Sequence, residues 1–287
     1  MRKIAAIILS LTAMVGCFDV EIYNTEHPDT AEVQIAVDMP VDGVYTVVLE
    51  GVAYELVDGA IQFPDYFTPG EYSVFAFNEV DCVSVGCTAT SAVASVELSG
   101  EAINSNLGTL YFGQQSLVVT PDNVISYTLN VEQVTAQVNI ELTLAGSAFV
   151  DLKGIYAQLD GVAQQWDCLA GCSYGAGGYV EPTLKQVESL SVARSGDVAS
   201  VVVAGSLTLI GLVENESQTL TIELSYADGS TTPIVSDVSS QLATLNQNKT
   251  TTITLTGEYE TEVSGAVDGG VVDWVVEDNS DDVLDLF

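Results

Sequence analysis

Residues 138–144 read Val-Asn-Ile-Glu-Leu-Thr-Leu, with an apolar side chain at every second position. Successive side chains of an extended strand point to opposite faces, so this stretch predicts a strand that buries one face. The same period of two recurs along the chain, and turns rich in Gly, Asp, Asn and Pro separate the segments. The sequence therefore predicts an all-β fold of the sandwich type. The other alternating segments are Val33 to Val37, Tyr72 to Ala76, Leu220 to Leu224 and Thr251 to Leu255.

A weak internal repeat divides the chain. Residues 43–53 read Gly-Val-Tyr-Thr-Val-Val-Leu-Glu-Gly-Val-Ala, and residues 154–163 read Gly-Ile-Tyr-Ala-Gln-Leu-Asp-Gly-Val-Ala. Each copy follows an alternating segment, so we interpret them as the openings of two successive domains, with chance similarity as the alternative. The length of the chain also favours two domains. We expect an N-terminal sandwich over residues 17–132 and a C-terminal sandwich over residues 133–264.

The N-terminus has the layout of an export signal. Two basic residues precede an apolar run over residues 4–15, and Gly16-Cys17 follows. The run is shorter than the roughly 20 residues that a membrane-spanning helix needs, and it ends like a lipobox, where a cysteine receives lipid. We expect a signal peptide over residues 1–16 and acyl chains, palmitate among them, on Cys17. Plain secretion with a chance cysteine is the alternative.

The chain is strongly acidic. It holds 40 Asp and Glu against 6 Lys and Arg, and its formal net charge is −34. No basic patch can be built to neutralise phosphates, so nucleic-acid binding is excluded, and attachment to a membrane rests on the lipid. The end of the chain, residues 265–287, is an acidic tail that contains an apolar piece, Val271 to Val276. We interpret this piece as a candidate extra strand, which completes the protein's own sheet or serves another subunit.

Four cysteines lie beyond Cys17, in two close pairs. They are Cys82 with Cys87 and Cys168 with Cys172. An exported location favours disulfides, and four cysteines allow three connectivities, among which the sequence does not choose. Two local bridges are the first interpretation. A zinc site with four cysteines is the alternative, although the spacings are wider than those of common zinc motifs.

The residues that carry catalysis form no convincing constellation. The single histidine, His27, stands next to Pro28 in the segment that leads into the first strand. A lone histidine supplies neither a catalytic triad nor a metal site. The Gly-rich loop over residues 171–178 lacks the lysine of a phosphate cradle. We therefore expect no enzymatic activity, no cofactor and no metal.

The first 80 residues carry a recognisable string. It includes Asn24 to Pro28, the strand from Ala31 to Asp38 and, most specifically, the turn Pro69-Gly-Glu-Tyr72 into an aromatic strand that ends Asn78-Glu79. This string resembles the fimbrillin superfamily of Bacteroidales surface lipoproteins, most closely its fimbrial anchor subunits of the FimB and Mfa type. The resemblance covers residues 17–165, and the extra cysteine pairs depart from its pattern, which indicates a divergent member.

The resemblance implies two tandem transthyretin-like, that is immunoglobulin-like, β-sandwiches. It places the protein at the outer membrane, exposed on the cell surface and held by lipid on Cys17. It also implies fimbrial subunits as partners, joined by donor-strand exchange, in which an extended segment of one protein completes an open sheet of another. The expected function is a non-enzymatic anchor or minor subunit of a fimbrium.

A glycan-binding surface lipoprotein is the second interpretation. Such a protein presents aromatic rings on a flat, exposed platform, and the candidates are Trp166, Tyr174 and Tyr179, with Trp274 as a further ring. Trp166 stands close to Cys168, so a bridged loop would present its ring. Packing of these rings in the core or in loops is the alternative.

Overall fold

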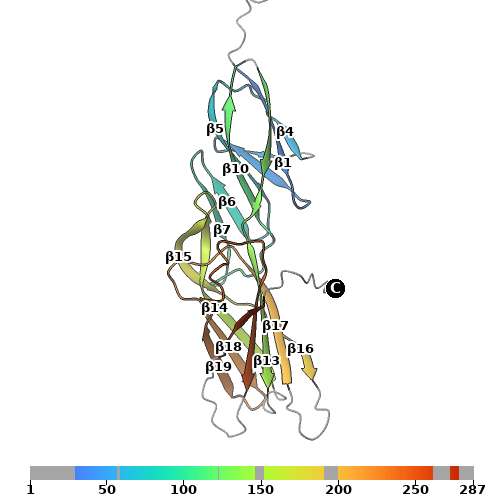
Figure 1. Cartoon of the computed structure of the whole chain (residues 1–287), viewed down its shortest axis with the longest axis vertical. Coiled ribbons are helices and arrows are strands. Elements are labelled where there is room, and N and C mark those ends of the chain that lie inside the picture. Colours follow the sequence, from blue (N-terminus) through green and yellow to red (C-terminus); the bar gives the residue numbers. More distant parts are fainter. Residues whose placement is uncertain are drawn as a thin grey trace, which may run out of the picture.

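The computed structural model describes residues 30–56, 59–121, 123–145, 152–190, 200–260 and 272–277. Every element within these ranges is a strand, and the strands build an elongated molecule (Figure 1). No helix in the described part of the chain is long and apolar enough to cross a membrane. The predicted signal peptide, Cys17 and His27 lie outside the described residues.

The N-terminal half packs two sheets face to face. One sheet has the strand order β11-β1-β4, and the other has the order β12-β10-β5-β2-β3. Their facing sides share a buried cluster that includes Val33, Ile35, Tyr45 and Leu117. The strands are β1 (Glu32–Asp38), β2 (Tyr45–Leu49), β3 (Val52–Glu55), β4 (Ala60–Gln62), β5 (Gly70–Asn78), β10 (Tyr111–Val119), β11 (Val124–Asn130) and β12 (Glu132–Gln133).

The C-terminal half also contains two main sheets. One has the order β16-β17-β13-β20-β21, and the other has the order β19-β18-β14-β15-β9-β8. The strands are β8 (Leu98–Ser99), β9 (Ala102–Ile103), β13 (Ala136–Ala145), β14 (Leu152–Asp167), β15 (Cys172–Val180), β16 (Lys185–Leu190), β17 (Ser200–Leu209), β18 (Thr219–Tyr226), β19 (Thr231–Asp237), β20 (Ile253–Glu260) and β21 (Val275–Glu277). Alternating burial along β13 agrees with the period of two in its sequence.

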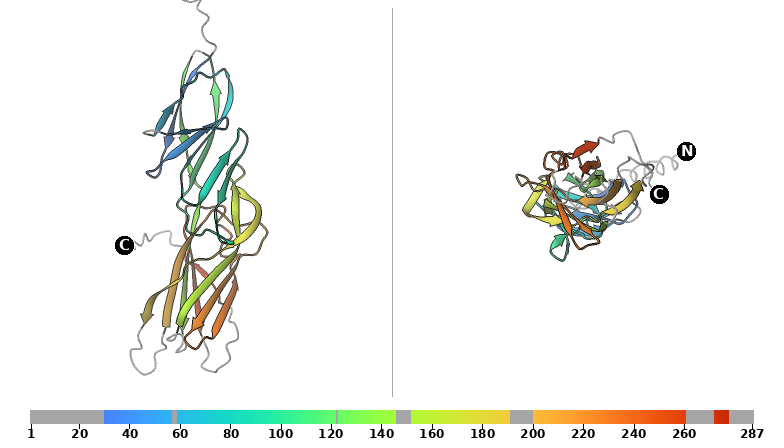
Figure 2. Two further views of the ribbon diagram at one scale, coloured as in Figure 1. Left: turned by 180° about the vertical axis from the view of Figure 1, so that it is seen from behind. Right: turned by 90° about the horizontal axis from the view of Figure 1, so that it is seen from below.

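An arm of the chain crosses from the N-terminal half into the second of these sheets. It begins with β6 (Val83–Cys87) and β7 (Ala92–Val96), which form a hairpin, and β7 then pairs with the end of β14. Further on, β9 pairs with β15. Figure 1 and the left view of Figure 2 show the arm beside the upper end of β14 and β15. The predicted boundary near residue 132 stays a prediction, and the arm hydrogen-bonds across it.

The hydrophobic core follows the same crossing. Besides the N-terminal cluster, one larger cluster runs from Val48 and Phe75 through Phe112 to the strands of the C-terminal half. The rings of Phe75 and Phe112 are stacked with their centroids 5.9 Å apart. Because buried apolar area is the main stabilising term in folding, this shared core couples the two halves.

The two copies of the internal repeat adopt different structures. In the first copy, Glu50 and Gly51 have φ values of 50° and 82° and form the two-residue turn of the β2–β3 hairpin. In the second copy, Gly161 has a φ of 77°, yet the chain continues as β14 with a bulge between Asp160 and Val162. Both glycines occupy the left-handed region. The strand continues in the second copy because β15 and β7 pair with it beyond the bulge.

Candidate functional site

The outer edge of β11 is an open sheet edge in the described structure. β11 pairs in parallel with β1 along its whole length, and its other side pairs with no strand among the residues that the structure describes. Its sequence, Val-Ile-Ser-Tyr-Thr-Leu-Asn, contains no charge and no proline. Val124 at its start is 69% exposed. An edge of this kind presents backbone donors and acceptors that another strand can use.

Two other long edge strands carry features that discourage pairing. β19 contains Pro233, which has no N–H to offer to a neighbouring strand. β16 begins with the exposed Lys185, and a lysine on an edge opposes the approach of another sheet. Compared with these two strands, β11 is the edge that lacks protection.

The matching edge in the C-terminal half is closed. β20 pairs in parallel with β13, as β11 does with β1, but its outer side pairs with β21. Just before β21, Val272 is 3% exposed and Trp274 is 6% exposed. Gly257 on β20 leaves room for them, since a Cβ there would lie 2.5 Å from Cγ1 of Val272 and 3.0 Å from the Trp274 ring. The Gln241 side chain donates a hydrogen bond to the Trp274 carbonyl, at 2.9 Å.

A cavity of about 630 Å³ lies where the two halves meet. Its lining comes from β10 and β12 in the N-terminal half, from the end of β14, and from the turn that precedes β20. Phe112 and Trp166 supply aromatic rings, and Gln133 and Asn248 supply amides. Its volume falls within the range of about 300–1,000 Å³ that ligand pockets have. We call this space the junction cavity.

Lys249 is the cation of the junction cavity. Its ammonium lies 4.0 Å from the centroid of the Trp166 ring and donates a hydrogen bond to the Ile210 carbonyl at 2.8 Å. Burial lowers the pKa of this lysine to about 7, and no carboxylate among the described residues contributes to the shift. The backbone carbonyl of Lys249 accepts a hydrogen bond from the Gln133 side chain at 2.9 Å, which ties the turn to β12.

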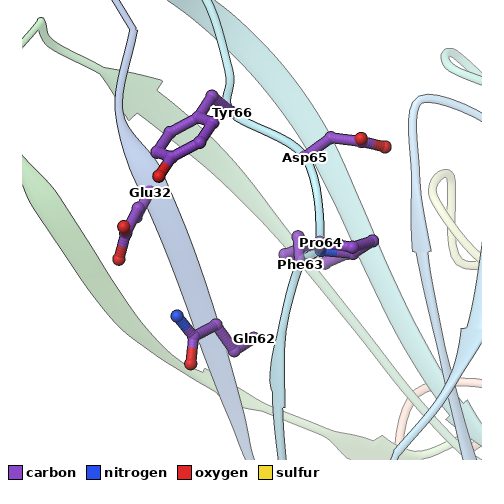
Figure 3. Close-up of a pocket in the computed structure, with 6 residues that line it drawn as sticks. All are labelled: Glu32, Gln62, Phe63, Pro64, Asp65 and Tyr66. Atoms are coloured by element: carbon purple, nitrogen blue, oxygen red, sulfur yellow. The ribbon is translucent and has the colours of Figure 1, made fainter.

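A smaller pocket of about 260 Å³ lies beside β1 and β4 (Figure 3). Glu32 and Gln62 line it from the two strands, and residues 63–66 complete it. The Tyr66 side chain extends toward Glu32, whereas Asp65 points away from both (Figure 3). No group of three His, Cys, Asp or Glu side chains in the described part of the chain could hold a metal ion. The pocket therefore offers polar surface without a marked chemistry.

The four cysteines are free thiols in this structure. A local bridge between Cys82 and Cys87 is wrong for this fold, because β6 runs extended between them. Its four steps alone span about 13 Å, whereas a disulfide needs Cα atoms within about 7 Å. Instead, the Cys82 sulfur accepts a hydrogen bond from the Asn104 amide at 3.0 Å.

The second cysteine pair flanks the turn between β14 and β15. Cys172 follows a four-residue connection after β14. The strand register sets it opposite Asp167, the residue before Cys168. A bridge between Cys168 and Cys172 stays a prediction. Burial raises the pKa of the Cys168 thiol to about 12 and that of the Cys87 thiol to about 11, so both are unreactive at neutral pH.

The aromatic rings proposed as a glycan platform do not gather on the surface. Trp166 is only 4% exposed and belongs to the large core cluster, so its expected presentation on a bridged loop is corrected. Its ring packs on the backbone of Gly211, where a Cβ would overlap with it. Trp274, directly before β21, is buried against Gly257 of β20. Tyr174 is 55% exposed and Tyr179 is half-buried, both on β15.

The Gly-rich stretch over residues 171–178 contains one catalytic spacing. Gly171-Cys-Ser-Tyr-Gly175 matches the Gly-x-Ser-x-Gly pattern of a nucleophile elbow, which needs a sharp turn from a strand into a helix. Here the stretch leads from a hairpin turn into β15, and Ser173 accepts a hydrogen bond from the Glu214 N–H at 3.4 Å. The setting that gives the motif its chemistry is absent from this hairpin.

One family model matches most of the chain, and solved structures share its fold. A family model described as fimbrillin-A associated anchor proteins Mfa1 and Mfa2 matches residues 32–280. The fimbrial anchor protein Mfa2 from Porphyromonas gingivalis has a similar structure, with a TM-score of 0.55 and 13% identity, covering 87% of this chain and 98% of that chain. A candidate adhesin from Bacteroides ovatus gives 0.56 and 14%, covering 85% and 93%. No curated protein matches the sequence. At these identities, the structural likeness shows the fold.

Proposed function

Because the chain belongs to the family of fimbrillin-A associated anchor proteins Mfa1 and Mfa2, we propose that it is a surface lipoprotein that anchors a fimbrium or forms a minor part of one. The family is one of fimbrial anchors and adhesins, which act at the cell surface and are typically non-enzymatic. The fold shared with an anchor protein and an adhesin supports this role. The proposal adds the lipid, the partner contacts and the residues that make them.

Lipid on Cys17 forms the tether in this proposal. The N-terminal signal pattern supports it, and the cysteine lies thirteen residues before the first described residue, Thr30. One acyl chain alone binds a membrane marginally, at about 0.8 kcal/mol for each buried methylene, so several chains on one residue hold firmly. The tether places both β-rich halves outside the outer membrane, with residues 17–132 and 133–264 as tandem sandwiches.

The uncharged edge of β11 carries the partner contact. A strand from a fimbrial subunit that adds beside β11 extends the sheet β11-β1-β4 by ordinary backbone hydrogen bonds. Side chains at alternate positions of the added strand meet the exposed positions of β11 at Val124, Ser126 and Thr128. The absence of charge and proline in this strand is the single observation that most favours strand complementation here.

Replacement of Cys17 by Ala tests the proposed function. The variant loses its lipid, so both the protein and the fimbriae that it holds move from the cell fraction to the medium. The matched control replaces Cys172, half-buried at the start of β15, by Ala and leaves both on the cells. Immunoblots of the cell fraction and medium, with electron microscopy of fimbriae, give the readout. Release of the protein while fimbriae stay attached in normal number contradicts the anchoring role.

A further inference from the structure

Three observations concern residues 278–287 and the junction cavity, and the first is the direction of β21. β21 runs antiparallel to β20, with Val275 opposite Thr256 and Glu277 opposite Thr254. The chain therefore leaves Glu277 heading toward the turn that precedes β20. If this register continued for five more residues, Asp282 would lie level with Lys249. The exit of the chain thus points at the junction cavity.

The chemistry of the tail is the second observation. Residues 278–287 read Asp-Asn-Ser-Asp-Asp-Val-Leu-Asp-Leu-Phe, so carboxylates come first and apolar side chains dominate the end. Ten extended residues span at most about 33 Å. Glu277 lies opposite Thr254, and Lys249 comes five residues before Thr254. Residues 278–287 are therefore long enough to reach Lys249 with residues left over. The segment offers anionic and apolar groups in one short length.

The chemistry of the cavity is the third observation. The mature chain is strongly negative, and Lys249 is the half-buried cation that lines this space. Its ammonium uses the Ile210 carbonyl and the Trp166 ring but no carboxylate among the described residues. Tyr111 and Phe112, from β10, add aromatic side chains to the lining. A buried cation without a carboxylate is stabilised by an anion that reaches it.

We propose that residues 278–287 bind in the junction cavity of their own chain, with Asp281 or Asp282 paired to the Lys249 ammonium and the apolar residues that follow placed against Tyr111 and Phe112. The segment thereby contacts residues of both halves and connects them on the side of β20. Other soluble peptides compete poorly, since a short tether gives the segment an effective concentration in the millimolar range. This inference does not depend on the anchoring function.

Zero-length crosslinking with a carbodiimide tests the proposal on lipid-free chain, residues 18–287. The reagent joins carboxylates to amines that are already in contact, and mass spectrometry identifies the linked peptides. Lys249 is expected to link to Asp281 or Asp282 roughly tenfold more than the exposed Lys153 and Lys185 do, as tethering predicts. The double change Asp281→Asn and Asp282→Asn removes the link. Asp228→Asn, on an exposed turn far from the cavity in sequence, is the matched control and leaves the link unchanged.

An equal mixture of isotopically light and heavy chains identifies which molecule supplies the tail. Links within one chain keep the two labels separate, as proposed. Mixed links show that the tail enters the cavity of a second copy and overturn the proposal, and so does tail linking that is equal for Lys249, Lys153 and Lys185.

Truncation after Glu277 gives an independent measurement that does not depend on the reactivity of Lys249. It leaves β21 in place and removes only the proposed occupant. The proposal predicts shifted NMR signals for the Trp166 indole N–H and for the Gln133 side-chain amide, both of which border the cavity. Signals that stay in place in the truncated chain contradict it.

Discussion

The two halves of the molecule share a strand arrangement and differ at one sheet edge. In each, an early strand pairs in parallel with a late one, β1 with β11 and β13 with β20. β20 is covered on its outer side by β21, whereas β11 has no such cover among the described residues. The C-terminal half therefore completes its sheet with its own chain. The N-terminal half leaves an edge on which a second protein can build.

The two halves also differ in their basic residues. The described residues of the N-terminal half, from Thr30 to Asn130, contain no Lys, Arg or His. Lys249, with its lowered pKa, lies at the entrance to β20 in the C-terminal half. The titration of Lys249 near neutral pH should therefore change the stability of the C-terminal half, which has the closed edge, and leave the N-terminal half unaffected.

The largest expected effect comes from removing the side chain that holds the closed edge. Trp274→Ala leaves a cavity over Gly257, and truncation of a buried Trp costs about 3–5 kcal/mol. Val124→Ala at the open edge changes an exposed side chain, so its effect stays within about 0.5 kcal/mol. Urea unfolding of both variants measures the free energy of unfolding. Equal losses for the two variants would remove the distinction between the edges.

The second effect is a pH dependence of Lys249 in the chain truncated after Glu277, where no carboxylate of residues 278–287 can pair with it. Its pKa in the folded protein, about 7, is lower than the ordinary 10.5, because burial disfavours the charged form. Below pH 7 the cost of burying the cation is fully present. Between pH 7 and 10.5 the unfolded chain binds more protons, so stability rises with pH by at most about 1.4 kcal/mol per unit. The Trp166 ring and the Ile210 carbonyl favour the cation, so they oppose the lowering of the pKa by burial and narrow the pH range of this dependence.

Lys249→Met isolates this contribution. Methionine cannot titrate, so in the truncated chain the free energy of unfolding of the variant minus that of the parent should fall as the pH rises from 7 to 10. Denaturant unfolding at several pH values gives the measurement. If the value for the variant minus that for the parent stays constant over this range, or rises, the buried ammonium is not the titrating group.

The smallest effect on stability is expected at the open edge, where the effect on binding is large. Val124→Lys with Thr128→Lys adds two charges to exposed positions of β11, and the change in stability stays within about 0.5 kcal/mol. Copurification of fimbrial subunits should fall sharply, because edge lysines oppose strand addition. Val235→Lys on β19, an exposed position beside Pro233, is the matched control and leaves copurification normal. Undiminished copurification with the doubly charged β11 would place the contact elsewhere.

Local patterns predicted the strands well but not their partners. The alternation in residues 138–144 became β13, and the apolar piece before Glu277 joined the protein's own sheet, because in both cases the buried face is encoded in neighbouring residues. The arm that contains β7 could not be assigned, since its pairing with β14 joins residues about 70 positions apart. The local bridge between Cys82 and Cys87 failed for the same reason, because pairing with β7 holds β6 extended.

The aromatic residues and the repeat show how context overrides a short motif. Trp166 is adjacent to a turn in sequence, yet Ala94 on β7 and the bare backbone at Gly211 leave space that its ring fills. Leu-Glu-Gly-Val-Ala and Leu-Asp-Gly-Val-Ala both place glycine at positive φ, but one is a hairpin and the other is a bulge. These residues encode the positive φ of the glycine. The strands available for pairing decide whether the glycine forms a hairpin turn or a bulge.

Hydrogen–deuterium exchange of the lipid-free chain, residues 18–287, compares the two edges in a single experiment. The account predicts that backbone amides on the outer side of β11 exchange rapidly in the free protein, whereas those of β20 opposite β21 are protected. On binding of the fimbrial subunit that copurifies with the protein, β11 should become protected while β20 stays unchanged. Slow exchange of β11 in the free protein, or a partner that protects another edge and leaves β11 exposed, would contradict the account.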